Sequence, residues 1–190
     1  ASEKRSRVLK VYNWADYIDE EVLAEFPVWY KEQTGEDIRI IYQVFDINEI
    51  MLTKIERGQE DFDLVCPSEY IIERMLKKDL LVPINRNFGK TPDYIPNISP
   101  YIQKELEKIS QPGRHTNDYV VPYMWGTAGI LYNKKFKTLE EVSSWGCLWD
   151  AVNRGKILMK DSYRDAYGTA IIYAHARQLA DSTITVEQLI

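Results

Sequence analysis

The stretch VLKVYNWADY, residues 8–17, joins an apolar run typical of a β-strand directly to Trp14, Asp16 and Tyr17. Open α/β sheets bind ligands in the crevice outside the carboxyl ends of their strands. Aromatic and acidic side chains at such an end are the groups that a cation site requires. The stretch therefore predicts both an α/β sheet and a cation site at its edge.

The same arrangement recurs twice further along the chain. The run FDLVC, residues 62–66, leads into Ser68 and Tyr70, and the run YVVPY, residues 119–123, leads into Trp125. Since the carboxyl ends of parallel strands meet at one edge of a sheet, we expect these side chains to gather there.

Strand and helix patterns alternate through the first part of the chain. We expect strands at 8–12, 38–44 and 62–66, and helices at 20–33, 48–57 and 70–78. Gly35 is the expected C-cap of the first helix, and Pro27 predicts a kink there or two shorter helices. This β-α-β-α-β-α order predicts a parallel sheet with right-handed crossovers.

A second strand and helix series follows a proline-rich excursion over residues 83–100. We expect strands at 119–123, 128–132 and 156–159, and helices at 101–109, 144–152 and 165–179. The direct passage from one extended run to the next near Gly126 is typical of a crossing between lobes. The sequence therefore predicts a first α/β lobe at 1–124 and the start of a second at 125–190.

Composition excludes several classes of function. A net charge of −5 over 190 residues argues against a nucleic-acid partner, which needs a basic face. No apolar run reaches the roughly 18 residues of a transmembrane helix. Neither Cys66 nor Cys147 has zinc-site spacing, and two histidines offer little for metal chemistry. We expect both cysteines to be unpaired and predict no cofactor.

Five blocks, in order and spacing, carry a resemblance to a known family. They are VYNWADYI, DFDLVCPSEY, VPYMWGTAGILYN, WGCLWD and DSYRDAYGTA, and together they span roughly residues 8–180. The chain resembles the periplasmic spermidine/putrescine-binding proteins of ABC transporters. The resemblance implies a type II clamshell of two α/β lobes that holds a polyamine between them. It also implies a non-enzymatic role, a membrane permease as partner, and a location outside the cytoplasm, either periplasmic or lipid-anchored.

The resemblance also implies roles for residues of the first lobe. Trp14 and Tyr17 correspond to walls of the polyamine site, and Asp16 to an ammonium partner at a position that the family usually fills with Glu. Ser68 and Tyr70 match the Ser and Tyr of the family's PSxY block, which hydrogen-bond and stack. A methylene chain that carries ammonium groups needs this mixture of aromatic walls and acidic or hydroxyl partners.

Further site residues are expected from the second lobe. Trp125 is either a ligand wall or packing between the lobes, and Asp165 aligns with a family Glu beside Arg164. Where the family often has an acid, this chain has Ser162, with Asp161 one position earlier. This departure fits weaker charge pairing, or a smaller or differently spaced amine, and Asp161 substitutes only if the backbone shifts.

Each of these residues also has an ordinary structural interpretation. Asp16 is placed to cap the first helix, Ser68 to cap the third, and Asp165 to begin a later one. Trp14 has no core to fill that the sequence reveals. These structural roles stay open beside the ligand-binding roles.

Two alternative functions also remain. Cys66 ends a strand before a helix, as nucleophiles do, but Pro67 follows it and no nucleophile elbow surrounds it. A clamshell that binds another solute, such as a sugar or an anion, is the second alternative. Because members of the family are much longer than this chain, which stops at Ile190, we expect a fragment with an incomplete second lobe.

Overall fold

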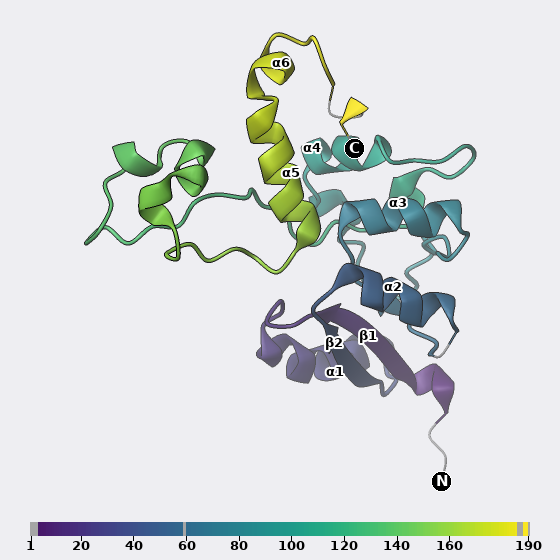
Figure 1. The fold of residues 1–190 in the computed structure, drawn as a ribbon. Helices are drawn as coiled ribbons and strands as arrows, with labels where there is room; N and C mark the ends of the chain where they lie inside the picture. Colours follow the sequence, from purple (N-terminus) through teal and green to yellow (C-terminus); the bar gives the residue numbers. More distant parts are fainter. Residues whose placement is uncertain (1–3, 59, 186–187, 190) are drawn as a thin grey trace. The chain divides into compact units, whose positions relative to one another are not determined.

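The computed structural model describes residues 4–58, 60–185 and 188–189 (Figure 1). Contacts within the chain divide it into two compact units, Ala1–Trp125 and Gly126–Ile190. Each unit is described by itself below.

The described residues form three strands, six α-helices and several short 3-10 turns. The strands are β1 (Val8–Trp14), β2 (Arg39–Phe45) and β3 (Leu64–Val65). The α-helices are α1 (Glu20–Thr34), α2 (Asn48–Glu56), α3 (Glu69–Lys77), α4 (Pro100–Glu107), α5 (Tyr163–Ala174) and α6 (Ala176–Ala180). The 3-10 turns are Arg5–Arg7, Ile95–Asn97, Thr116–Asp118, Glu140–Val142, Trp145–Trp149 and Ala151–Asn153.

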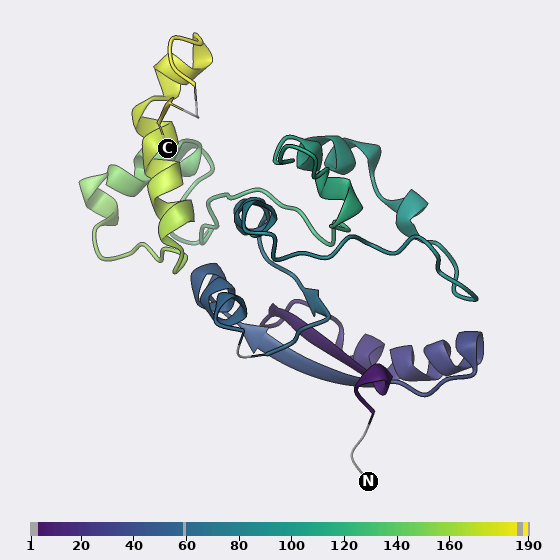
Figure 2. The same ribbon diagram turned by 90° about the vertical axis from the view of Figure 1, so that its right-hand side faces the viewer.

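The first unit is built on a parallel sheet with the strand order β2-β1-β3. Trp14 pairs with Phe45 across β1 and β2, and Tyr12 with Val65 across β1 and β3. β1 and β2 lie side by side in both views (Figure 1 and Figure 2). The chain passes from β1 outward to β2 and then back to β3, so right-handed crossovers put α1 and α2 on opposite faces. The predicted α/β class and parallel sheet are thus confirmed.

Helix α1 begins and ends where its sequence predicts. Asp19 caps its first turn by accepting a hydrogen bond from the Glu21 amide, and Gly35 ends it with φ at 78°. Only glycine takes this left-handed conformation without strain. Pro27 lies inside a single helix, so the alternative of two shorter helices was wrong. Capping at both ends holds the helix together despite the one hydrogen bond that proline removes.

The core of the first unit lies where α2 and α3 pack against the sheet. Its buried members are Tyr12, Phe45, Met51, Leu52, Ile71 and Met75. Lys54 reaches over this core, with its Nζ atom 5.1 Å from the centre of the Tyr12 ring and 2.8 Å from Glu60. An ammonium group held by an aromatic face and a carboxylate is stable at a half-buried position. The packing of the core and the contacts of Lys54 therefore stabilise the sheet.

A cluster of ion pairs ties the start of β1 to the segment before β3. Asp61 accepts from Arg5 Nε at 2.7 Å and from Lys10 Nζ at 2.5 Å, and Asp63 accepts from Arg5 Nη2 at 3.0 Å. The contacts of Lys10 and Arg5 hold the pKa of the Asp61 carboxyl well below its usual range. Folding therefore favours the charged form of Asp61.

Replacing Asp61 with asparagine is expected to lower the thermal unfolding midpoint at neutral pH. Because the pKa of Asp61 is lowered by folding, its contribution is present above the unfolded value of about 4 and is lost as pH falls below it. Thermal unfolding across the acid range should therefore show the two proteins converging as pH falls. A difference that stays constant down to strongly acidic pH would contradict this assignment.

Three of the expected strands are absent from the described residues. Residues 119–123, 128–132 and 156–159 contain no strand and join no ladder, and Leu131 and Leu158 are fully exposed. A strand needs a hydrogen-bonded neighbour, and a short apolar run alone does not supply one. These three strand predictions were wrong for the chain as described.

The expected helices of the second unit are shorter than predicted. The helix expected at 144–152 forms two 3-10 turns, because Asp150 accepts from the Val152 amide and so starts a new turn in mid-segment. The helix expected at 165–179 is divided at His175 into α5 and α6. Among the described residues, no helix is both long enough and apolar enough to span a membrane.

Candidate functional site

The carboxyl edge of the β2-β1-β3 sheet collects polar and aromatic groups from all three strands. Trp14 is the last residue of β1, Asn48 begins α2 soon after β2, and Ser68 lies between β3 and α3. Because the strands are parallel, these positions share one edge of the sheet. Two of the three predicted strand ends, those of β1 and β3, therefore lie at one edge of the sheet, whereas residues 119–123 before Trp125 form no strand.

Asn48 joins two of the predicted site residues through its buried side chain. Its Nδ2 atom donates to Ser68 Oγ and to Tyr70 Oη, each at 3.0 Å. Its Oδ1 atom accepts from the Ser68 backbone amide at 3.1 Å. Only 6% of Asn48 is exposed. Ser68 makes no side-chain cap bond to α3, so its hydroxyl serves this network and not the predicted capping role.

Tyr70 is half-buried against the core, and both ends of its side chain have partners. Its hydroxyl donates to Glu49 Oε1 at 2.9 Å, and the guanidinium of Arg74 lies 5.8 Å from the centre of its ring. Asn48 and Glu49 are not among the site residues that the sequence predicts. The signal that identifies them is the rule applied to the other two strands, since they lie just beyond the end of β2.

Trp14 has a structural partner that the sequence did not reveal. Its ring lies 4.5 Å from that of Phe45, and it packs at the margin of the core while remaining half-buried. The expectation that Trp14 has no core to fill was therefore wrong, because the neighbouring strand β2 ends beside it in register. One face of the indole supports the sheet edge.

The loop after β1 holds Asp16 exposed in a left-handed conformation, with φ at 52°. Aspartate and asparagine tolerate this region better than most residues. Asp19, three residues later, caps α1, so the alternative that Asp16 is the N-cap was wrong. Asp16 thus does not provide the N-cap of α1.

The Tyr123 hydroxyl is hydrogen-bonded to the loop that follows β1, although Tyr123 is distant from this loop in sequence. Its hydroxyl donates to the Tyr17 carbonyl oxygen at 2.7 Å, and the two rings meet edge to face at 5.5 Å. Burial raises the pKa of the Tyr123 hydroxyl. The hydroxyl therefore stays protonated and can donate this hydrogen bond at neutral pH.

Replacing Tyr123 with phenylalanine is expected to lower the free energy of unfolding by about 1 kcal/mol, the net value of one hydrogen bond. The ring contact with Tyr17 is kept, so only the hydrogen bond to the Tyr17 carbonyl oxygen is lost. Denaturant unfolding measures the change, with Tyr94→Phe as the matched control because the described residues offer the Tyr94 hydroxyl no hydrogen bond. Equal changes in the free energy of unfolding for the two substitutions would contradict a stabilising role for this hydrogen bond.

The remaining predicted site residues lie at or beyond the end of the first unit. Trp125, the last residue of the first unit, is 70% exposed. In the second unit, Asp165 pairs with Lys160 at 2.6 Å, and Ser162 caps α5 by accepting from the Asp165 amide. Asp161 is exposed. Ser162 thus has a helix-capping role at the position where the family often has an acid.

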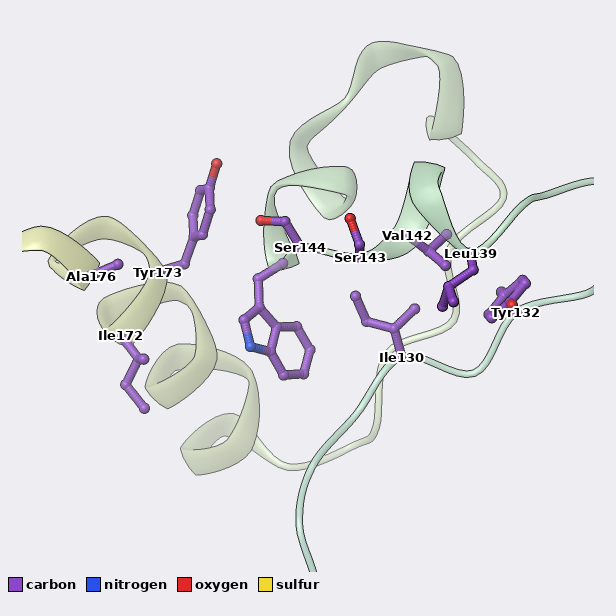
Figure 3. Close-up of a pocket in the computed structure, with 10 residues that line it drawn as sticks. Ile130, Tyr132, Leu139, Val142, Ser143, Ser144, Ile172, Tyr173 and Ala176 are labelled. Atoms are coloured by element: carbon purple, nitrogen blue, oxygen red, sulfur yellow. The ribbon is translucent and has the colours of Figure 1, made fainter. Parts of the chain in front are cut away.

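The second unit contains an open cavity of about 470 Å³ that the sequence analysis did not identify (Figure 3). Its walls are mostly apolar and include the hydroxyl-bearing side chains of Tyr132, Ser143, Ser144 and Tyr173. The lining residues are Ile130, Tyr132, Leu139, Val142, Ser143, Ser144, Trp145, Ile172, Tyr173 and Ala176. None of the predicted site residues lines it.

The Cys66 thiol does not have the character of a nucleophile. Cys66 and Cys147 are unpaired, and burial raises the pKa of the Cys66 thiol. A reactive cysteine needs the opposite shift, toward the thiolate. Across residues 4–58, 60–185 and 188–189, no group of three or more His, Cys, Asp or Glu side chains could hold a metal ion.

Sequence comparison finds curated relatives that cover most of this chain. It is 32% identical over 177 residues to the putrescine-binding periplasmic protein PotF of Escherichia coli (strain K12), covering 88% of this chain and 44% of that protein. It is 29% identical over 167 residues to the spermidine/putrescine-binding periplasmic protein of the same organism, with 87% and 44% covered. The chain thus spans less than half the length of these relatives. No family model matches it.

Two solved structures share the fold. A putative spermidine/putrescine ABC transporter protein from Listeria monocytogenes has a TM-score of 0.58 and 35% identity, covering 76% of this chain and 40% of that one. The spermidine/putrescine ABC transporter substrate-binding protein PotD from Streptococcus pneumoniae, in complex with calcium and HEPES, has a TM-score of 0.50 and 38% identity, with 63% and 32% covered.

Proposed function

We propose that the chain belongs to the family of spermidine/putrescine-binding periplasmic proteins, which its similarity to the relatives above supports, and that the full-length protein captures a polyamine and delivers it to an ABC permease. In this proposal residues 1–124 form the first α/β lobe and residues 125–190 begin the second. The protein works outside the cytoplasm, in the periplasm or attached by a lipid, and catalyses no reaction.

The observation that carries the proposal is the collection of aromatic and oxygen-bearing side chains at the carboxyl edge of the sheet. Trp14 supplies a flat apolar face, and Ser68 and Tyr70 supply oxygen atoms held by Asn48. Asp16 supplies an exposed negative charge in the loop that follows β1. A polyamine, with its apolar methylenes and positive ends, matches these groups better than a sugar or an anion does.

The proposed ligand set consists of residues from both parts of the chain. It comprises Trp14, Asp16, Tyr17, Ser68, Tyr70, Trp125, Asp161 and Asp165. The ion pair between Lys160 and Asp165 implies that the ammonium group of a ligand competes with a side chain of the protein itself. That competition favours a ligand with high positive charge.

Cleft closure is the proposed mode of capture. A ligand that contacts both lobes binds the closed form more tightly than the open form, and it shifts the population toward closure by that difference in affinity. The closed, loaded protein is then the form that the permease recognises. The net charge of −5 favours encounter with cationic ligands at low ionic strength.

Calorimetric titration of the full-length protein tests the proposed function. Spermidine and putrescine are expected to bind and to raise the thermal unfolding midpoint, because both stabilise the native state by mass action. Glucose and sulfate serve as neutral and anionic controls and should do neither. Binding of glucose or sulfate together with the absence of amine binding would overturn the proposal.

A further inference from the structure

We propose that Asn48 is a positioning residue for the ligand site, and that together with Glu49 it fixes the orientation of the Ser68 and Tyr70 side chains. This inference rests on the proposed function, because it concerns how Ser68 and Tyr70 are presented to a polyamine. Neither Asn48 nor Glu49 needs to touch the ligand for the effect.

The orientation of the Asn48 amide is determined by a backbone donor. The Ser68 amide N–H points to Oδ1 at 3.1 Å, so that atom is the carbonyl oxygen and the other atom is the NH₂ group. Both hydrogens of the NH₂ group are then used, one on Ser68 Oγ and one on Tyr70 Oη. One buried amide thereby fixes two side chains that come from a different strand end and helix.

Glu49 determines the direction of the Tyr70 hydroxyl. A carboxylate only accepts hydrogen bonds, so the Tyr70 proton points to Glu49 Oε1 at 2.9 Å. Asn48 occupies one lone pair of the same oxygen. Asn48 and Glu49 together therefore fix the rotation of the Tyr70 hydroxyl.

A double-mutant cycle in the full-length protein tests the inference. Asn48→Ala is expected to weaken spermidine binding about tenfold, the change expected for loss of an ordinary hydrogen bond. In a background that carries Ser68→Ala and Tyr70→Phe, the same substitution should change the affinity less than about twofold, because its partners are gone. A tenfold effect that persists in this background would overturn the positioning role.

Asn153→Ala is the matched control. Asn153 is also buried, at 8% exposure, but it donates to the Cys147 carbonyl and contacts no predicted ligand residue. It is expected to lower the unfolding midpoint and to leave the dissociation constant for spermidine unchanged. If Asn48→Ala behaves in the same way, Asn48 is only structural and the inference is wrong.

A second variant keeps the test decisive if Asn48→Ala does not fold. Asn48→Asp preserves the acceptor for the Ser68 amide and removes both N–H donors. The measurement is then the coupling free energy for spermidine binding between Asn48→Asp and the Ser68→Ala, Tyr70→Phe background. Additive losses of affinity would overturn the inference. Absence of any polyamine binding by the unsubstituted protein would instead overturn the proposed function along with it, so the two failures are distinguishable.

Discussion

Replacing Trp14 with alanine is expected to weaken spermidine binding to the full-length protein by about 1–3 kcal/mol. This range combines the loss of a cation–π contact with the loss of apolar area that covers the methylene chain. The substitution should also lower the unfolding midpoint, because the indole packs on Phe45 at the margin of the core. Calorimetry below the unfolding transition measures the first effect, and thermal unfolding measures the second.

Trp29 provides the control for this prediction. It is a half-buried tryptophan of α1 whose ring centre lies 5.7 Å from that of Phe26, and it lies far from the strand ends along the chain. Trp29→Ala should lower the unfolding midpoint without changing the affinity for spermidine. If the Trp14 and Trp29 variants both lose stability and both keep full affinity, Trp14 is a structural residue and not a wall of the site.

Replacing Asp16 with asparagine is expected to weaken putrescine binding by about 1.5–3 kcal/mol, the value of a hydrogen bond to a charged group. Asparagine accepts the left-handed conformation at this position, so the loop should keep its shape. The remaining affinity should also depend less on salt, since an ionic contact is lost. Titrations at low and high ionic strength measure both effects.

Asp19→Asn is the matched control for the charge of Asp16. It removes the same charge from the same loop, but asparagine keeps the capping of α1 that Asp19 provides. Its affinity and salt dependence should match those of the unsubstituted protein. Equal losses in the two variants would show that general negative charge attracts the amine and that Asp16 is not a specific partner.

The first unit was predictable because its sequence patterns are local and agree with one another. Apolar strand runs, the helix that Asp19 begins and Gly35 ends, and the return to β3 all lie within a short span. Such short crossovers leave few topologies to consider. The parallel sheet and the positions of its carboxyl ends followed from these patterns.

The second unit was less predictable because strand formation depends on distant partners. Residues 128–132 and 156–159 have apolar runs of strand length, yet they pair with no described segment. A short apolar run does not distinguish a strand from unpaired extended chain. The break at Asp150 depends on a single side-chain hydrogen bond, which competes with the helix locally.

The site was predictable in its aromatic and hydroxyl members but not in what holds them. Ser68 and Tyr70 were identified from the strand end, whereas Asn48 reads in sequence as an ordinary first residue of a helix. Its role depends on a contact across 20 residues of chain. Likewise, the contact of Trp14 with Phe45 depends on strand register, which the sequence alone does not specify.

The most direct test of the central claim is a crystal structure of the full-length protein with spermidine. The account predicts amine density at the carboxyl edge of the β2-β1-β3 sheet, with methylenes against Trp14 and an ammonium group near Asp16 and the Tyr70 oxygen. Spermidine bound elsewhere, for example in the cavity beside Trp145 and Tyr173, with this edge of the sheet occupied only by water, would contradict it.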